Sequence, residues 1–133
     1  MSAGKIILTA TALFTAISPF VADWNETHIH NPNWPPHAKF HNGQTMSMGA
    51  ALGLSTLASL WLRRTELSHD RLLAATTAAS LYWITQASAA LYPDADFYDP
   101  ETPRLPANQI VLFVLPILGL NAAGYALERR RLR

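Results

Sequence analysis

The stretch LPANQIVLFVLPILGLNAAGYAL, residues Leu105–Leu127, contains 23 residues and no Asp, Glu, Lys or Arg. A helix needs about 20 apolar residues to cross a hydrocarbon core about 30 Å thick. Three further stretches without these charged residues are 17, 21 and 22 residues long: Ile6–Ala22, Asn42–Leu62 and Leu72–Pro93. One such run is compatible with a buried core helix, but four that fill most of a 133-residue chain predict a membrane protein.

Composition agrees with this interpretation. Half of the residues are hydrophobic and 14% are charged, whereas a soluble domain has about 25% charged residues. We therefore predict an all-α membrane protein with a single domain, residues 1–133. The expected architecture is a four-helix transmembrane bundle with a histidine-rich, non-cytoplasmic loop between the first two helices. Its spans are expected at about 5–22, 44–62, 71–92 and 107–127.

The distribution of basic residues predicts the orientation. Eight of the ten lie at the two termini or between the second and third spans: Lys5, Arg63, Arg64, Arg71, Arg129, Arg130, Arg131 and Arg133. Because cytoplasmic loops are enriched in Lys and Arg, both termini are predicted to be cytoplasmic. The histidine-rich loop and the loop Asp94–Arg104 are then periplasmic, luminal or extracellular. The arginines near the C-terminus suit anionic lipid, and no nucleic-acid partner is expected. A cleaved signal peptide is the alternative for the N-terminus, although Phe20 occupies the place of a small residue in its cleavage site.

The segment DWNETHIHNPNWPPHAKFHNGQ, residues Asp23–Gln44, holds four of the five histidines. A helix that begins at Pro36, with a possible pause at Asn42-Gly43, would place His37 and His41 on one face. Glu26, His28 and His30 alternate, so an extended segment would point all three the same way. Such residues near one another suit either metal binding or proton transfer.

The metal hypothesis uses four imidazoles as ligands for zinc or copper: His28, His30, His37 and His41. Otherwise no cofactor is expected, and the absence of cysteine excludes thiolate ligands and disulfides. A third interpretation treats the loop as a structural cap, in which polar side chains satisfy its own backbone.

The acid/base hypothesis assigns proton transfer to His37 and His41, with Glu26 or Asp23 orienting or charging them. A hydrophobic substrate entering from the bilayer would then contact aromatic and amide side chains of the loop and spans: Trp24, Trp34, Gln44, Tyr82, Trp83, Gln86, Asn108 and Asn121. The alternative is that these amides hydrogen-bond neighbouring helices. Gly49 and Gly53 form a GxxxG pattern, which predicts close helix packing without naming the partner.

The run DWNETHIHNPNWPPHAKFHNGQTMSMG, residues Asp23–Gly49, resembles the signature of a family of small four-span integral membrane proteins of unknown function from bacteria and fungi. The resemblance covers about the first 60 residues. Some members carry a loose acetyltransferase label, which we do not adopt because the chain has no Gly-rich loop to hold a phosphate. In architecture only, the chain is similar to emopamil-binding and sterol-isomerase proteins, but its histidines are concentrated in a loop rather than in mid-span.

Together these observations favour a membrane protein that binds a hydrophobic small molecule within the bundle. They leave open whether it also acts on that molecule as an acid/base isomerase or cyclase. The alternative function is a zinc- or copper-binding membrane protein or an accessory subunit of a membrane complex. The expected partners of the protein are the lipid bilayer and the hydrophobic small molecule. A second copy of the chain or a subunit of a membrane complex is the further alternative.

Overall fold

The computed structural model describes residues 2–62, 66–98 and 103–132. It contains the helices α1 (Ala3–Asp23), α2 (Pro36–Trp61), α3 (His69–Ala89) and α4 (Leu115–Arg131), and a π-helical turn η1 (Ile110–Val114) that leads directly into α4. The described residues form no strand, which confirms the prediction of an all-α fold with four helices. Arg63, Arg64 and Arg133, used above to predict orientation, lie outside the described residues.

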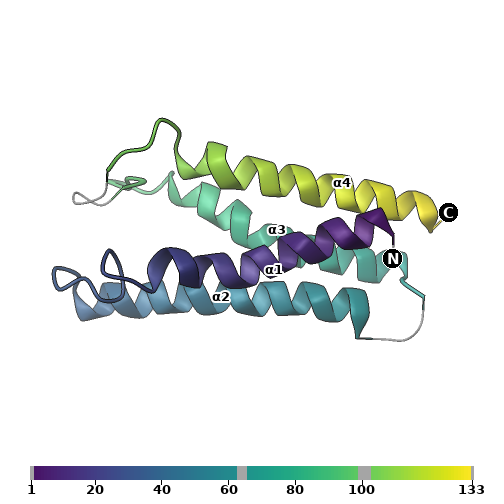
Figure 1. The fold of residues 1–133 in the computed structure, drawn as a ribbon, viewed down its shortest axis with the longest axis horizontal. Coiled ribbons are helices and arrows are strands. Elements are labelled where there is room, and N and C mark those ends of the chain that lie inside the picture. Colours follow the sequence, from purple (N-terminus) through teal and green to yellow (C-terminus); the bar gives the residue numbers. More distant parts are fainter. Residues whose placement is uncertain (1, 63–65, 99–102, 133) are drawn as a thin grey trace.

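The helices run along one long axis and alternate in direction (Figure 1). Both termini lie at one end of the bundle, together with the segment that joins α2 to α3. The α1–α2 loop and the long α3–η1 connection lie at the other end, which we call the loop end. There the α1–α2 pair and the α3–α4 pair stand apart.

Local sequence explains where the helices begin. Ser2 and Ser68 cap α1 and α3 by accepting hydrogen bonds from the backbone N–H groups of Lys5 and Arg71. Pro36 occupies the first turn of α2. Backbone N–H groups in that turn have no partner within the helix, so the missing N–H of proline costs no hydrogen bond. α2 runs through Gly43 without interruption, so the pause considered at Asn42-Gly43 does not occur.

The π turn η1 ends at Val114, two residues before Pro116, where the last helix begins. Proline cannot donate a backbone hydrogen bond and crowds the preceding turn. The Leu115 N–H donates to the carbonyl of Ile110, five residues back. In an α-helix it would donate to the carbonyl four residues back.

Two glycines bring α1 and α2 together. A Cβ atom built on Gly53 would stand 2.5 Å from the Ala12 carbonyl oxygen, and one on Gly49 would stand 2.8 Å from Pro19 Cγ. No side chain fits at either position. The close packing predicted from the GxxxG pattern is therefore confirmed, and α1 is its partner.

The start of α1 packs against the second half of α4, again with glycines at the contact. A Cβ on Gly4 would stand 2.6 Å from the Gly124 carbonyl oxygen. One turn further along α4, the buried Glu128 carboxylate accepts a hydrogen bond from the Ser2 hydroxyl. This buried pair ties the start of the chain to the end of its last helix.

The bundle has a polar element in its centre. The fully buried Thr15 hydroxyl accepts a hydrogen bond from the Trp83 indole N–H over 2.8 Å and donates one to the Thr11 carbonyl. The Trp83 ring stacks on Phe14, with 5.7 Å between ring centroids. Thus α3 and α1 are joined by a buried hydrogen bond as well as by packing.

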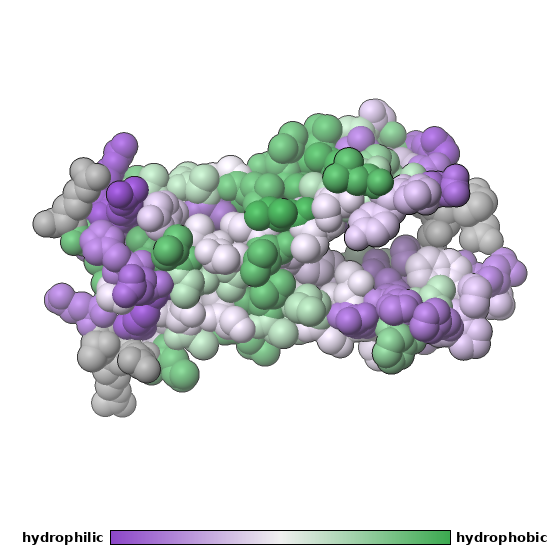
Figure 2. Space-filling view, turned by 180° about the vertical axis from the view of Figure 1, so that it is seen from behind, coloured by the Kyte–Doolittle hydropathy of each residue, from purple (hydrophilic) through white to green (hydrophobic). Residues whose placement is uncertain are grey.

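The outside of the bundle is unusually apolar. Large hydrophobic side chains are exposed on every helix: Leu13, Ile17, Leu54, Leu73, Ile84, Leu115 and Leu120. Figure 2 shows hydrophobic residues across the middle of one face and hydrophilic residues at both ends. Two of the helical segments, Ala3–Asp23 and 110–131, are long and apolar enough to cross a membrane, judged by length and composition.

Candidate functional site

The α1–α2 loop folds as a series of tight turns. Asn25 Oδ1 accepts hydrogen bonds from both the backbone N–H and the hydroxyl of Thr27, and the Asn25 carbonyl accepts the N–H of His30. The buried Asn31 side chain donates to the Thr27 carbonyl and accepts the N–H of Asn33. Short polar side chains therefore supply the partners that this irregular backbone needs.

These turns correct one expectation. The segment from Glu26 to His30 is not extended, so its three alternating side chains do not share a face. Glu26 is exposed, His30 is exposed against the edge of Trp24, and His28 is half-buried. The Asn25 and Thr27 hydrogen bonds favour a turn over an extended strand, and alternation alone gave no sign of this.

His28 lies beside Asp23, the last residue of α1. His28 Nε2 is 3.9 Å from Asp23 Oδ1, and Asp23 Oδ2 accepts a 2.7 Å hydrogen bond from the Asn42 amide of α2. The other side of the imidazole packs edge-on against Trp34, with 4.9 Å between ring centroids. The end of α1, the loop and the start of α2 are thereby joined around one imidazole.

Hydrogen bonding fixes the His28 tautomer. The Thr27 hydroxyl must donate to Asn25 Oδ1, which can only accept, over 2.6 Å. The same hydroxyl lies 2.7 Å from His28 Nδ1 and must therefore accept the proton of that nitrogen. Nε2 is consequently the ring nitrogen without a hydrogen in the neutral form, and it lies on the side of Asp23.

A cleft opens beside His28 at the loop end, which Figure 2 shows hollowed. We call it the loop-end cleft. Its volume is about 490 Å³, within the 300–1,000 Å³ usual for small-molecule sites. It is lined by both loops, the end of α3 and the start of η1: His28, Trp34, Gln86, Ala89, Ala90, Asp94, Ala95, Asp96, Phe97, Tyr98, Gln109 and Ile110.

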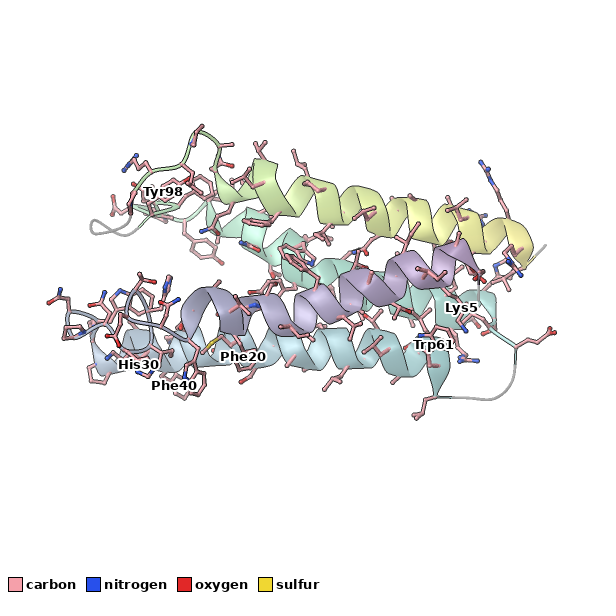
Figure 3. All side chains as sticks on the ribbon, in the orientation of Figure 1. Lys5, Phe20, His30, Phe40, Trp61 and Tyr98 are labelled. Carbon is pink, nitrogen blue, oxygen red and sulfur yellow. The ribbon has the colours of Figure 1, made fainter. Side chains whose placement is uncertain are left out.

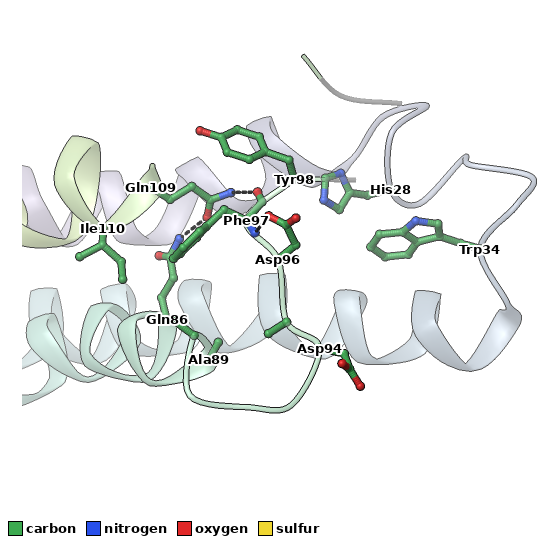
Figure 4. Close-up of a pocket in the computed structure, with 12 residues that line it drawn as sticks. His28, Trp34, Gln86, Ala89, Asp94, Asp96, Phe97, Tyr98, Gln109 and Ile110 are labelled. Atoms are coloured by element: carbon green, nitrogen blue, oxygen red, sulfur yellow. Dashed lines mark hydrogen bonds between the residues drawn. The ribbon is translucent and has the colours of Figure 1, made fainter. Parts of the chain in front are cut away.

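Two glutamines lie at one side of this cleft, opposite His28 and Trp34 (Figure 4). Gln86 of α3 donates from Nε2 to Gln109 Oε1 over 2.9 Å, and Gln109 Nε2 donates to the Phe97 carbonyl. Gln86 Oε1 is buried and has no hydrogen-bond partner within the described part of the chain. Such an oxygen can accept a hydrogen bond from a donor outside the described residues, such as water or a ligand.

The rim of the cleft carries charge. Asp96 pairs with Arg104 over 2.6 Å, and the Arg104 guanidinium lies 6.0 Å from the Tyr98 ring centroid. Tyr98 donates its hydroxyl hydrogen bond to the Ala107 carbonyl. Figure 3 shows Tyr98 on the α3–α4 side of the loop end, and His30 and Phe40 on the α1–α2 side.

The four histidines that we expected to converge as metal ligands lie in separate places. His37 and His41 pair with each other on the exposed start of α2 and do not line the cleft. His30 packs beside Trp24, which is 59% exposed and also stacks on Phe20. The described residues contain no group of three or more His, Asp or Glu side chains that could hold a metal ion.

Of the expected substrate-binding residues, Trp34 and Gln86 line the cleft. Trp83 and Asn121 are buried instead, and Asn121 donates to the Ala79 carbonyl and to Ser80 Oγ. The remaining residues serve local structure. Asn108 Oδ1 accepts N–H bonds at the start of η1, Gln44 contacts His41, and the half-buried Tyr82 ring lies against Gly49.

The cleft also contains residues that our sequence analysis did not select, above all Gln109, Phe97 and Tyr98. Gln109 follows Asn108 at the start of a predicted span, and a second polar side chain there was the available signal. Phe97 and Tyr98 belong to a loop whose course depends on tertiary contacts, so their sequence carried no comparable signal.

Comparison with known proteins identifies a family. A family model described as Family of unknown function (DUF6640) matches residues 7–133. No curated protein and no solved structure matches the chain. Because the match covers nearly the whole chain, this protein belongs to the DUF6640 family, whose function is unknown.

Proposed function

We propose that this is a multi-pass membrane protein in which all four helices cross the bilayer. Exposed hydrophobic side chains on every helix support this, since soluble monomers rarely expose large continuous apolar surfaces. α2 and α3 are rich in small polar residues, but several of their hydroxyls donate hydrogen bonds within the helix. Ser55, Ser59 and Thr76, for example, each donate to the carbonyl four residues back, which lowers the cost of placing them in lipid.

The proposed orientation places the termini in the cytoplasm and the loop end outside. The described basic residues at the terminal end are Lys5, Arg71, Arg129, Arg130 and Arg131, while only Lys39 and Arg104 of the described residues lie at the loop end. This asymmetry is the one that the positive-inside rule describes.

The function we propose is binding of a hydrophobic small molecule with a hydrogen-bonding head group in the loop-end cleft. The observation that carries the proposal is the cleft itself, which has a volume of about 490 Å³. His28 and Trp34 of one loop line one side of it, and Gln86 and Gln109 line the other. Gln86 Oε1 would accept a hydrogen bond from a hydroxyl or amine of the ligand, and Trp34 and Phe97 would contact its apolar body.

Any proton transfer in this cleft belongs to His28. It is the one histidine of the five that lines the cleft, and its Nε2 lies 3.9 Å from Oδ1 of the Asp23 carboxylate. This assignment replaces His37 and His41 as the acid/base pair but keeps Asp23 as the orienting carboxylate. An isomerase or cyclase activity would require this pair.

Ligand binding is tested by thermal unfolding of the purified protein in lipid nanodiscs, with a panel of sterols, long-chain alcohols and long-chain amines. A ligand present at 100 times its Kd stabilises the folded state by about 2.7 kcal/mol, so a bound compound raises the unfolding midpoint. Gln86→Leu removes the buried acceptor and Trp34→Ala removes the aromatic wall, and each is expected to reduce that rise.

The matched control is His69→Ala, which changes an exposed side chain at the opposite end of α3 and should leave the ligand-induced rise unaltered. The proposal is wrong if no compound of the three classes stabilises the wild-type protein. It is also wrong if Gln86→Leu, Trp34→Ala and His69→Ala respond to the ligand equally.

A further inference from the structure

His37 and His41 form a second polar cluster outside the loop-end cleft. They lie one turn apart on the first two turns of α2, and their Nε2 atoms are 3.0 Å apart. Both side chains are exposed. Phe40 stacks on His37 with an interplanar angle of 5° and meets His41 edge-on, so an apolar ring borders the pair on one side.

The His41 ring is oriented by a third residue. His41 Nδ1 lies 3.2 Å from Gln44 Oε1, an atom that can only accept a hydrogen bond. His41 therefore carries its proton on Nδ1, and its Nε2 presents a lone pair toward His37. Metal-binding histidines have this arrangement, in which the nitrogen that does not bind the metal donates to an oxygen acceptor.

The spacing of the two nitrogens matches that of two ligands on one metal ion. With Zn–N bonds of about 2.0–2.1 Å and an N–Zn–N angle between about 90° and 110°, two imidazole nitrogens lie about 2.8–3.4 Å apart. The observed 3.0 Å falls within this interval. A metal ion would replace the single proton now shared between the rings, after His37 moves its own proton to Nδ1.

We propose that His37 and His41 form a two-histidine site for a borderline transition-metal ion such as Zn²⁺ or Cu²⁺, with water in the remaining positions. Imidazole ligands favour these ions over Mg²⁺ and Ca²⁺, which prefer oxygen. Lys39 does not oppose the ion directly, because residues two apart point to different sides of a helix. The site is separate from the proposed small-molecule cleft and does not depend on it.

The test is a calorimetric titration of Zn²⁺ and of Cu²⁺ into the full-length protein without a polyhistidine tag, which measures affinity and stoichiometry. Nitrogen coupling in the electron paramagnetic resonance spectrum of bound Cu²⁺ is a second readout. We expect one ion per chain. His37→Ala and His41→Ala should each weaken binding by at least about tenfold, since loss of an outer-shell partner alone costs about 10–100-fold. His30→Ala, which removes an exposed histidine outside the pair, should have no effect.

A second variant keeps composition and charge constant. Lys39→His combined with His41→Lys leaves two histidines two residues apart, where they no longer face each other. It should bind Zn²⁺ as weakly as the alanine variants while keeping its helical circular dichroism. Equal affinity of this variant and the wild type overturns the proposal, as does wild-type affinity in both His37→Ala and His41→Ala.

Discussion

Gly53 of α2 lies so close to Ala12 of α1 that a Cβ on the glycine would stand 2.5 Å from the Ala12 carbonyl oxygen. The obstacle is backbone, which cannot rotate away as a side chain can. Since lipid removes most of the hydrophobic drive for helices to associate, such close contact is a principal source of stability for a bundle in a membrane.

Gly53→Ala should therefore separate α1 from α2. Overpacking of this kind costs about 1–3 kcal/mol, which we expect as a lower midpoint of thermal unfolding in detergent. Gly43→Ala is the matched control in the same helix, because a Cβ at Gly43 meets nothing within 4 Å. That change should be neutral or stabilise the helix by up to about 1 kcal/mol. Equal loss of stability in both variants would show that α1 and α2 do not pack as described.

The hydrogen bond between Trp83 and Thr15 gives a prediction for the core. Thr15→Val should destabilise the protein by about 1–3 kcal/mol, because it leaves the buried indole N–H without a partner. Trp83→Phe removes the donor as well. If the hydrogen bond exists, Thr15→Val should cost less in the Trp83→Phe background than in the wild type, and a double-mutant cycle of unfolding free energies measures the difference. Strict additivity of the two changes would contradict the contact.

The pair Asp23 and Asn42 gives a prediction for the loop. Asn42→Asp sets two carboxylates against each other where a 2.7 Å hydrogen bond now joins α2 to the end of α1. We expect faster hydrogen exchange of the backbone amides of His28–Asn31. Adding Asp23→Asn to this variant exchanges the two side chains, so that an amide in α1 can donate to a carboxylate in α2. The double variant should regain the slow exchange of the wild type. Failure of the double variant to recover would mean that the pair does not hold the loop.

The sequence predicted four helices and their approximate positions because each has a strong local determinant, although the last helix continues to Arg131, beyond the predicted end at residue 127. Charge-free runs gave their positions, Pro36 gave the start of α2, and the GxxxG pattern predicted a close contact. Tertiary information was needed to identify α1 as the partner of Gly53. It was also needed to place the π turn, which depends on how Pro116 is accommodated in a helix that continues through it.

The candidate site was less predictable because the loops decide it. Four histidines close together in sequence suggested one cluster, but the side-chain hydrogen bonds of Asn25 and Thr27 direct the loop into turns. His28 consequently faces the cleft while His37 and His41 stay on the surface of α2. Gln86 was selected from its polarity within a span, whereas its partner Gln109 became evident only when α3 and η1 lay side by side.

Membrane topology is open to a direct test because the natural chain contains no cysteine. Single cysteines are introduced at exposed positions: Glu26→Cys in the α1–α2 loop, Glu66→Cys in the segment before α3, and Leu54→Cys in the second half of α2. A membrane-impermeant maleimide added to intact cells should label Glu26→Cys alone, and permeabilised cells should add Glu66→Cys. Leu54 is 62% exposed in the isolated chain, so in water its replacement would react readily, but in a bilayer it should react only after denaturation. Labelling of Leu54→Cys in permeabilised cells would contradict the membrane assignment, and equal labelling of Glu26→Cys and Glu66→Cys in intact cells would contradict the orientation.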